Sequence, residues 1–196
     1  MYRGLLIALV FSISNAYAGD VYESYTSLLG FKLEKTNLHK IINKLGHTTI
    51  RHTGDAANSY YGICYVSKEN NISVYFESGE MGGNEHTLLS FRVKNKVEKA
   101  HECGILKVNS QELKLGSIKL GKKINQVKNS LPQPVEVIEK KLLHKYFGKS
   151  PFTKSDIERT KVKDLKYAFW DVSIFIEVFE NNDVVSSYKV SQVTSW

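Results

Sequence analysis

The residues best suited to chemistry lie in one loop, which reads SGEMGGNEH. Its glycines would let backbone N–H groups converge on an anion, while Glu80, Glu85 and His86 could hold a cation or exchange protons. The loop lacks the lysine and hydroxyl residue that complete a phosphate-binding loop, and its ligand spacing identifies no metal. An alternative is a flexible tip whose glycines serve unusual backbone angles. If the loop has a function, we expect it to act mostly as a contact surface. We predict no metal and no cofactor, and we treat these residues as a candidate interaction loop: Ser78, Gly79, Glu80, Met81, Gly82, Gly83, Asn84, Glu85 and His86.

The two cysteines, Cys64 and Cys103, allow two interpretations. In an oxidising compartment an even pair most simply forms one disulfide bond. The competing hypothesis is a nucleophilic thiolate at Cys103 assisted by His101, which lies two positions earlier. Because a free thiol tends to oxidise outside the cytoplasm, we favour the disulfide.

The other histidines and serines form no recognisable catalytic motif. The sequence contains neither the HExxH arrangement of zinc hydrolases nor a GxSxG nucleophile elbow. We therefore expect a protein that is not an enzyme. The alternative is a periplasmic enzyme that uses Cys103 and His101, or the loop residues Glu80, Glu85 and His86.

Residues 1–18 have the pattern of a signal peptide. Arg3 supplies a positive charge, an apolar run extends from Leu5 to Ile13, and Ala16-Tyr17-Ala18 resembles a cleavage site. The apolar run is shorter than the roughly 20 residues of a membrane span, so we predict no transmembrane segment. We expect cleavage after Ala18 and a periplasmic or secreted product.

The chain is basic, with 27 lysine and arginine residues against 20 acidic ones and a net charge of +7. Lysine clusters such as Lys140, Lys141 and Lys145 could favour an acidic glycan or lipid. A solvated lysine surface is the simpler interpretation. We expect no nucleic-acid partner, because the charge is scattered and no recognition module is visible.

The elements that would position the loop are two alternating apolar segments on either side of it. Ile72, Val74 and Phe76 share one face of the first segment, and Leu89, Phe91 and Val93 share one face of the second. This pattern predicts a β-hairpin with an enlarged tip. Upstream, the stripe from Leu38 to Leu45 predicts a short helix, capped by Thr36 or Asn37 and ended by Gly46.

The second half of the chain repeats the pattern of the first. Ile124, Val127 and Leu131 follow Leu38, Ile41 and Leu45 at a constant offset, and a further hairpin is expected across Asn181-Asn182-Asp183. We predict an α+β fold of two tandem repeats, each a short helix (or helix pair) packed on an antiparallel sheet. The expected divisions are a signal peptide at 1–18, a first repeat with the disulfide at 19–110, and a second repeat at 111–196.

Several segments of the second half resemble a known family. They are Ile118-Lys119-Leu120-Gly121-Lys122, Val127, Leu131-Pro132-Gln133-Pro134, Tyr167 and the run from Ile176 to Val184. Together they are similar to the small repeat of the outer-membrane assembly lipoproteins (BamE, also SmpA/OmlA), and tandem β-lactamase inhibitor proteins use a similar unit. The resemblance implies a helix packed on a sheet. The chain differs in lacking a lipidation cysteine and in carrying the unusual segment Ser150 to Asp164.

These observations favour a non-catalytic protein-binding module of the cell envelope. We expect its partner to be another envelope or secreted protein, and one form of this function is inhibition of, or immunity to, an envelope hydrolase. Many aromatic residues fall on predicted strands, and those that face away from the core would anchor such a contact. The oligomeric state is not determined by the sequence.

Overall fold

The computed structural model describes residues 22–55, 59–97, 100–163 and 168–195. The expected signal peptide, its cleavage site and Tyr167 lie outside these residues. The described chain has an α+β architecture with three α-helices, a nine-stranded sheet and a small two-stranded sheet. None of the helices in the described ranges is long and apolar enough to cross a membrane.

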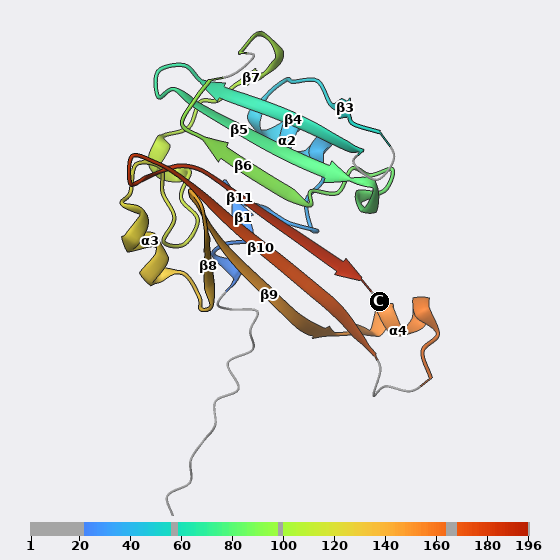
Figure 1. The fold of residues 1–196 in the computed structure, drawn as a ribbon. Coiled ribbons are helices and arrows are strands. Elements are labelled where there is room, and N and C mark those ends of the chain that lie inside the picture. Colours follow the sequence, from blue (N-terminus) through green and yellow to red (C-terminus); the bar gives the residue numbers. More distant parts are fainter. Residues whose placement is uncertain (1–21, 56–58, 98–99, 164–167, 196) are drawn as a thin grey trace, which may run out of the picture.

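The large sheet contains strands from both halves of the chain. Its order is β3 (Arg51–Thr53), β4 (Tyr60–Ser67), β5 (Ile72–Gly79), β6 (Ser90–Lys94), β11 (Val184–Ser195), β10 (Phe169–Asn181), β9 (Lys141–Pro151) and β8 (Val135–Ile138), and β7 (Gly104–Ile105) pairs with β4. All neighbours are antiparallel except β4 and β7. The halves meet where β6 pairs with β11, with Val93 opposite Tyr188. They therefore form one continuous sheet rather than two (Figure 1).

Both predicted hairpins are present. β5 pairs with β6 around the candidate loop, and β10 pairs with β11 around Asn182 and Asp183. These two turn residues have φ values of 52° and 61°. Asparagine and aspartate tolerate this left-handed conformation, which two-residue hairpin turns of the favoured twist require.

The predicted first helix is α2 (Leu38–Leu45). Asn37 caps it by accepting a hydrogen bond from the backbone N–H of Lys40 at 2.9 Å, and Gly46 follows its end with a φ of 105°. The second is α3 (Ile124–Ser130), which precedes Leu131 and Pro132. The segment interpreted as an unusual insertion contains the end of β9 and a third helix, α4 (Lys154–Thr160).

Five shorter elements connect these helices and strands. They are β1 (Ser27–Leu28), β2 (Phe31–Lys32) and the 3₁₀ turns η2 (Glu80–Gly82), η3 (Ala100–Glu102) and η4 (Ser110–Glu112).

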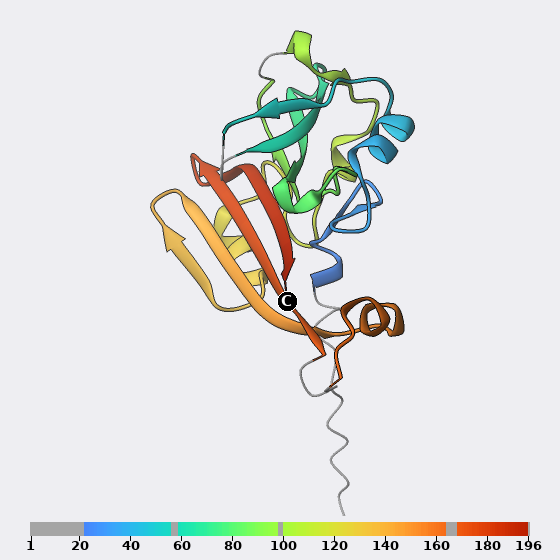
Figure 2. The same cartoon turned by 90° about the vertical axis from the view of Figure 1, so that its right-hand side faces the viewer.

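One hydrophobic core serves both halves. It lies on the inner face of the sheet, where Phe76 and Phe91 of the first half and Ile176 and Val190 of the second are all buried. Helix α2 and the β1–β2 hairpin lie behind the sheet in Figure 1 and on its right in Figure 2. In the described part of the chain no helix covers the opposite face, which we call the outer face. The fold thus leaves one side of a large sheet exposed.

Candidate functional site

The candidate loop is closed by its own backbone hydrogen bonds. Gly83 N–H donates to the carbonyl of Glu80 at 3.1 Å, His86 N–H to Gly83 at 3.0 Å, and Thr87 N–H to Gly82 at 3.0 Å. These bonds form because η2 turns the chain immediately after β5 ends at Gly79. The loop is consequently a structured projection at the end of the hairpin.

The structure explains why glycine occupies positions 82 and 83 of the loop. A Cβ atom on Gly82 would lie 2.0 Å from the Ser78 hydroxyl and 2.8 Å from the Thr87 carbonyl oxygen, so a side chain has no space there. Gly83 has a φ of 59°, which favours glycine. The glycines therefore serve close packing and turn geometry, as in the second interpretation of the sequence.

The titratable side chains of the loop do not form a metal site. Among the described residues there is no group of three or more histidine, cysteine, aspartate and glutamate side chains that could hold a metal ion. His86 packs between His39 and Tyr61, with ring centroids 6.1 Å and 4.4 Å away. Glu80 and Glu85 are exposed. What the loop presents outward is an acidic surface together with Met81, whose side chain is 63% exposed.

Cys64 and Cys103 form a disulfide bond in the structure. It ties β4 to the segment that follows η3. Neither sulfur is a free thiol, so Cys103 offers no thiolate to act with His101. His101 is exposed, and its Nε2 lies 3.5 Å from a carboxylate oxygen of Glu102.

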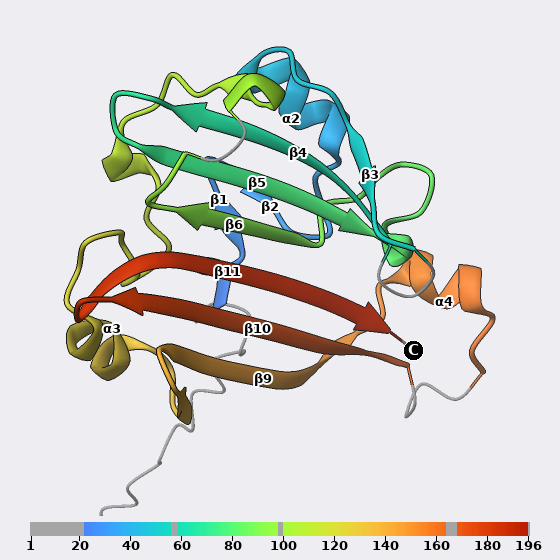
Figure 3. The same cartoon turned by 45° about the horizontal axis from the view of Figure 1, so that its top comes forward.

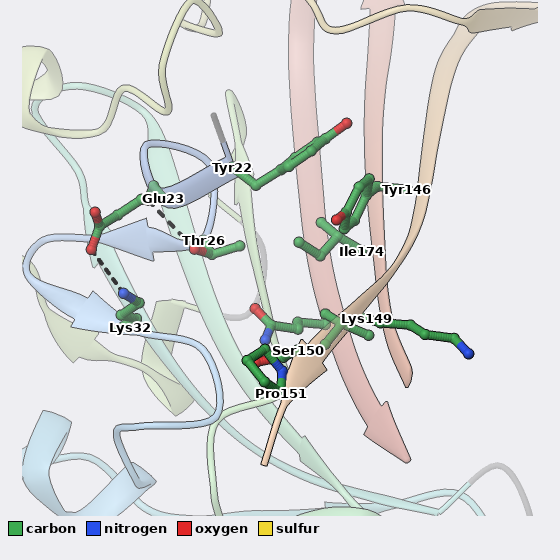
Figure 4. Close-up of a pocket in the computed structure, with 11 residues that line it drawn as sticks. Tyr22, Glu23, Thr26, Lys32, Tyr146, Lys149, Ser150, Pro151 and Ile174 are labelled. Carbon is green, nitrogen blue, oxygen red and sulfur yellow. Dashed lines mark hydrogen bonds and ion pairs between the residues drawn. The ribbon is translucent and has the colours of Figure 1, made fainter. Parts of the chain in front are cut away.

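A cavity of about 320 Å³ lies on the inner side of the sheet, between the β1–β2 region and strands β9, β10 and β11 (Figure 4). Tyr22 and Tyr146 form part of its wall, with ring centroids 4.3 Å apart. Lys32 and Glu23 form an ion pair of 2.8 Å at its rim. No residue pattern in the sequence pointed to this cavity, because its walls come from segments far apart in the chain.

Tyr22 is held in place by the buried side chain of His144. The Nδ1 atom of His144 lies 2.8 Å from the Pro134 carbonyl, which can only accept, so Nδ1 carries the proton. With Nδ1 as the donor, Nε2 can accept from the Tyr22 hydroxyl at 3.0 Å. Burial, followed by the neighbouring Tyr146 hydroxyl, raises the pKa of Tyr22. Tyr22 is therefore a neutral structural wall of the cavity.

The outer face carries aromatic rings beside cations. Lys94 lies over the ring of Tyr75 at 5.5 Å, and Lys141 lies over Phe179 at 5.8 Å. Phe175 meets Phe147 edge to face at 5.9 Å. Such rings provide large, rigid contact area, which is typical of protein interfaces.

A charge cluster lies on the outer face where the two halves join. Glu77 of β5 is 3.0 Å from Lys189 of β11 and 3.9 Å from Arg92 of β6, and it accepts a hydrogen bond from the Ser90 hydroxyl at 2.7 Å. Burial alone would raise the pKa of Glu77, but Lys189, Ser90 and Arg92 together outweigh burial and lower it. A shallow hollow of about 260 Å³ lies beside the cluster. No pattern in the sequence indicated this cluster, because Lys189 reaches Glu77 only through the β6–β11 pairing, whereas Ser90 and Arg92 lie beside Glu77 in the β5–β6 hairpin.

Comparisons of the chain with known protein families, with curated proteins and with solved structures find no match. The resemblance to the outer-membrane assembly lipoproteins thus stays a prediction from the sequence. The function must be inferred from the surfaces described above.

Proposed function

We propose that this chain is an exported protein of the cell envelope that binds another protein without catalysing a reaction. The binding surface consists of the outer face of the sheet and the loop from Ser78 to His86. One specific form is an inhibitor or immunity protein whose loop enters the cleft of an envelope hydrolase. The observation that carries the proposal is the outer face, a broad sheet surface that no helix of the described chain covers.

The composition of that face supports protein binding. Tyr75, Phe175 and Phe179 offer aromatic contact area. Because neighbouring strands already order these side chains, they would lose little conformational entropy when a partner binds. The charges beside them are already paired within the face, as in the Glu77–Lys189 ion pair of 3.0 Å. A partner that covers this face would therefore bury few isolated charges, which is the costly event in association.

Matched contacts in the two halves support the proposed duplication. Leu38, at the start of α2, donates its N–H to the His86 carbonyl at 3.0 Å, and Ile124, at the start of α3, donates to the Asp183 carbonyl at 2.9 Å. Both acceptors have positive φ, 51° for His86 and 61° for Asp183. The residues before the helices also form equivalent isolated bridges, Asn37 with Thr87 and Lys123 with Val184. Each helix is thus tied in the same way to the residues that follow the hairpin turn of its own half.

The strand order is consistent with the same idea. Read outward from the β6–β11 pair, each half contributes three consecutive antiparallel strands, β6-β5-β4 on one side and β11-β10-β9 on the other. The corresponding hairpins differ mainly at the tip, which is a two-residue turn at Asn182-Asp183 and an enlarged loop at Ser78 to His86. An enlargement in only one repeat supports a specific role for this loop.

The expected signal peptide supports export, and the disulfide is consistent with an oxidising compartment. The test is retention of a partner from envelope extracts by an immobilised chain of residues 19–196. Tyr75→Ser with Phe175→Ser should weaken retention through the outer face, and Met81→Ser should weaken it through the loop. Val137→Ser is the matched control, because Val137 is 56% exposed at the sheet edge but belongs to neither surface. If nothing is retained at micromolar concentration, or if all variants retain the same proteins equally, the proposal is wrong.

A further inference from the structure

The two edges of the large sheet are protected to different degrees. On one side, β3 pairs with β4 at residues 60–62, and β7 pairs with β4 at residues 65–66. On the other side, β8 pairs only with residues 141–144 of β9. β9 continues to Pro151, and within the described chain no strand pairs with residues 145–151 on the side away from β10 (Figure 3). We call this segment the open edge.

The register identifies the backbone groups that face outward from the open edge. Ile138 and Lys141 are partners across the two-residue turn of the β8–β9 hairpin, so their N–H and C=O groups point at each other. The direction of these backbone groups alternates along a strand. The N–H and C=O groups of the odd-numbered residues Lys145, Phe147 and Lys149 therefore also point away from β10. The even-numbered residues bond to β10, and just beyond the strand the N–H of Phe152 donates to Ala168 at 2.9 Å. The open edge therefore presents a regular row of donors and acceptors that have no partner strand in the described part of the chain.

Hollows border the open edge on both faces of the sheet. On the outer face, a depression of about 250 Å³ is lined by Phe147, Lys149 and Asp171. On the inner face, the 320 Å³ cavity beside Tyr22 and Tyr146 reaches the edge at Ser150 and Pro151 (Figure 4). Side chains of an added strand would alternate between the faces, so each set would meet one hollow.

Charge indicates the kind of segment that would fit. The side chains of Lys145 and Lys149 are both exposed on the outer side of the open edge, on either side of Phe147, which is 67% exposed. A second copy of this chain would bring lysines against lysines, a known means of preventing edge-to-edge pairing. Lys145 already forms an ion pair with Glu136 at 3.0 Å, so a strand with acidic side chains on this face would be attracted mainly by Lys149.

We propose that the open edge of β9 binds an extended segment of a partner protein as an additional antiparallel strand. Acidic side chains of that segment lie beside Lys145 and Lys149, and its apolar side chains face the inner cavity. This inference rests on the proposed protein-binding function and specifies the chemistry of the partner. Main-chain hydrogen bonds supply affinity, and the alternation of acidic and apolar residues supplies specificity.

The test uses the chain of residues 19–196 and a synthetic peptide, acetyl-EVELEVE-amide. On binding, amide hydrogen exchange of Lys145, Phe147 and Lys149 should slow by about tenfold or more, because these N–H groups gain partners. Exchange at Tyr146, Gly148 and Ser150 should not change, since their N–H groups already bond to β10. Equal slowing of both sets, or none at saturating peptide, would overturn the proposal.

Two modified peptides supply the matched control without altering the protein. In antiparallel pairing the glutamate amides face β9, so N-methylation of the glutamates should weaken binding by about tenfold or more, and N-methylation of the apolar residues should have little effect. Equal affinity of the two peptides would exclude strand addition. Protection of Phe147 that rises with protein concentration in the absence of peptide would show pairing with a second copy instead, and would also refute the proposal.

One protein variant separates this inference from the proposed function. Phe147→Pro removes an outward N–H and none of the hydrogen bonds to β10. It should abolish peptide binding and reduce retention of the envelope partner. If wild type and Phe147→Pro retain that partner equally, the open edge is not used although the protein-binding function stands. If the variant fails to fold, the peptide pair still decides the question.

Discussion

Substitution of Glu77 by glutamine should destabilise the protein in a pH-dependent way. The change keeps the shape of the side chain and its hydrogen bond with Ser90 but removes the negative charge that Lys189 faces at 3.0 Å. The Glu77 side chain is 15% exposed and the Lys189 side chain 24% exposed, so screening by water is incomplete. Loss of a charge-assisted hydrogen bond in such a site costs about 2 kcal/mol in the free energy of unfolding.

The pH dependence follows from the direction of the pKa shift. Folding lowers the pKa of Glu77 below its ordinary value of 4.5, which means that the ionised form is stabilised in the folded state. This contribution is fully present above the ordinary pKa and is lost as the pH falls through the folded pKa. The stability difference between wild type and Glu77→Gln should therefore be about 2 kcal/mol at neutral pH and should approach zero in acid.

Urea unfolding of both proteins at neutral and acidic pH measures this difference. A double-mutant cycle with Lys189→Met isolates the pair, and its coupling energy should be about 1 kcal/mol at neutral pH. A difference that is the same at both pH values would refute the electrostatic reasoning, because a packing defect does not titrate. A coupling energy near zero would show that Lys189 is not the partner that matters.

Four further variants test other parts of the structure by the same unfolding assay. Replacement of Cys64 and Cys103 by serine should lower stability by about 4 kcal/mol, because the disulfide closes a long loop in the unfolded chain; a loss below about 1 kcal/mol would contradict this. Gly82→Ala should cost about 1–3 kcal/mol, since its Cβ has no space beside Ser78, and normal stability would show that the loop is packed differently. Ser78→Ala should be neutral or stabilising, because the buried hydroxyl has no hydrogen-bond partner among the described residues; a loss of stability would reveal one. Asn37→Ala should cost about 1 kcal/mol through loss of the helix cap, whereas an unchanged midpoint would argue against that cap.

Local patterns predicted the elements of this fold well. The helix at Leu38 to Leu45 and its asparagine cap are readable because each depends on residues within one or two turns. Both hairpins are readable for the same reason, since alternation and turn residues are local signals. The disulfide followed from the cysteine count, because a single pair has only one way to form.

The pairing of distant strands could not be predicted from the sequence. Nothing in the periodicity of β6 or β11 specifies that they meet, because many apolar strands are compatible neighbours until the whole sheet is assembled. The contact of Lys189 with Glu77 and the cavity beside Tyr22 depend on that assembly, so both were missed. For the candidate loop, the sequence indicated a projecting tip but not its cause, which is the close approach of Gly82 to Ser78.

The β6–β11 pairing also has a consequence for how the chain folds. Contacts between segments this far apart form slowly, because a large loop must close before they are gained. Until then, β6 and β11 each present an unsatisfied strand edge, and such intermediates aggregate. Refolding from denaturant should therefore be slow, and its yield should fall as protein concentration rises and recover when a holdase chaperone is added.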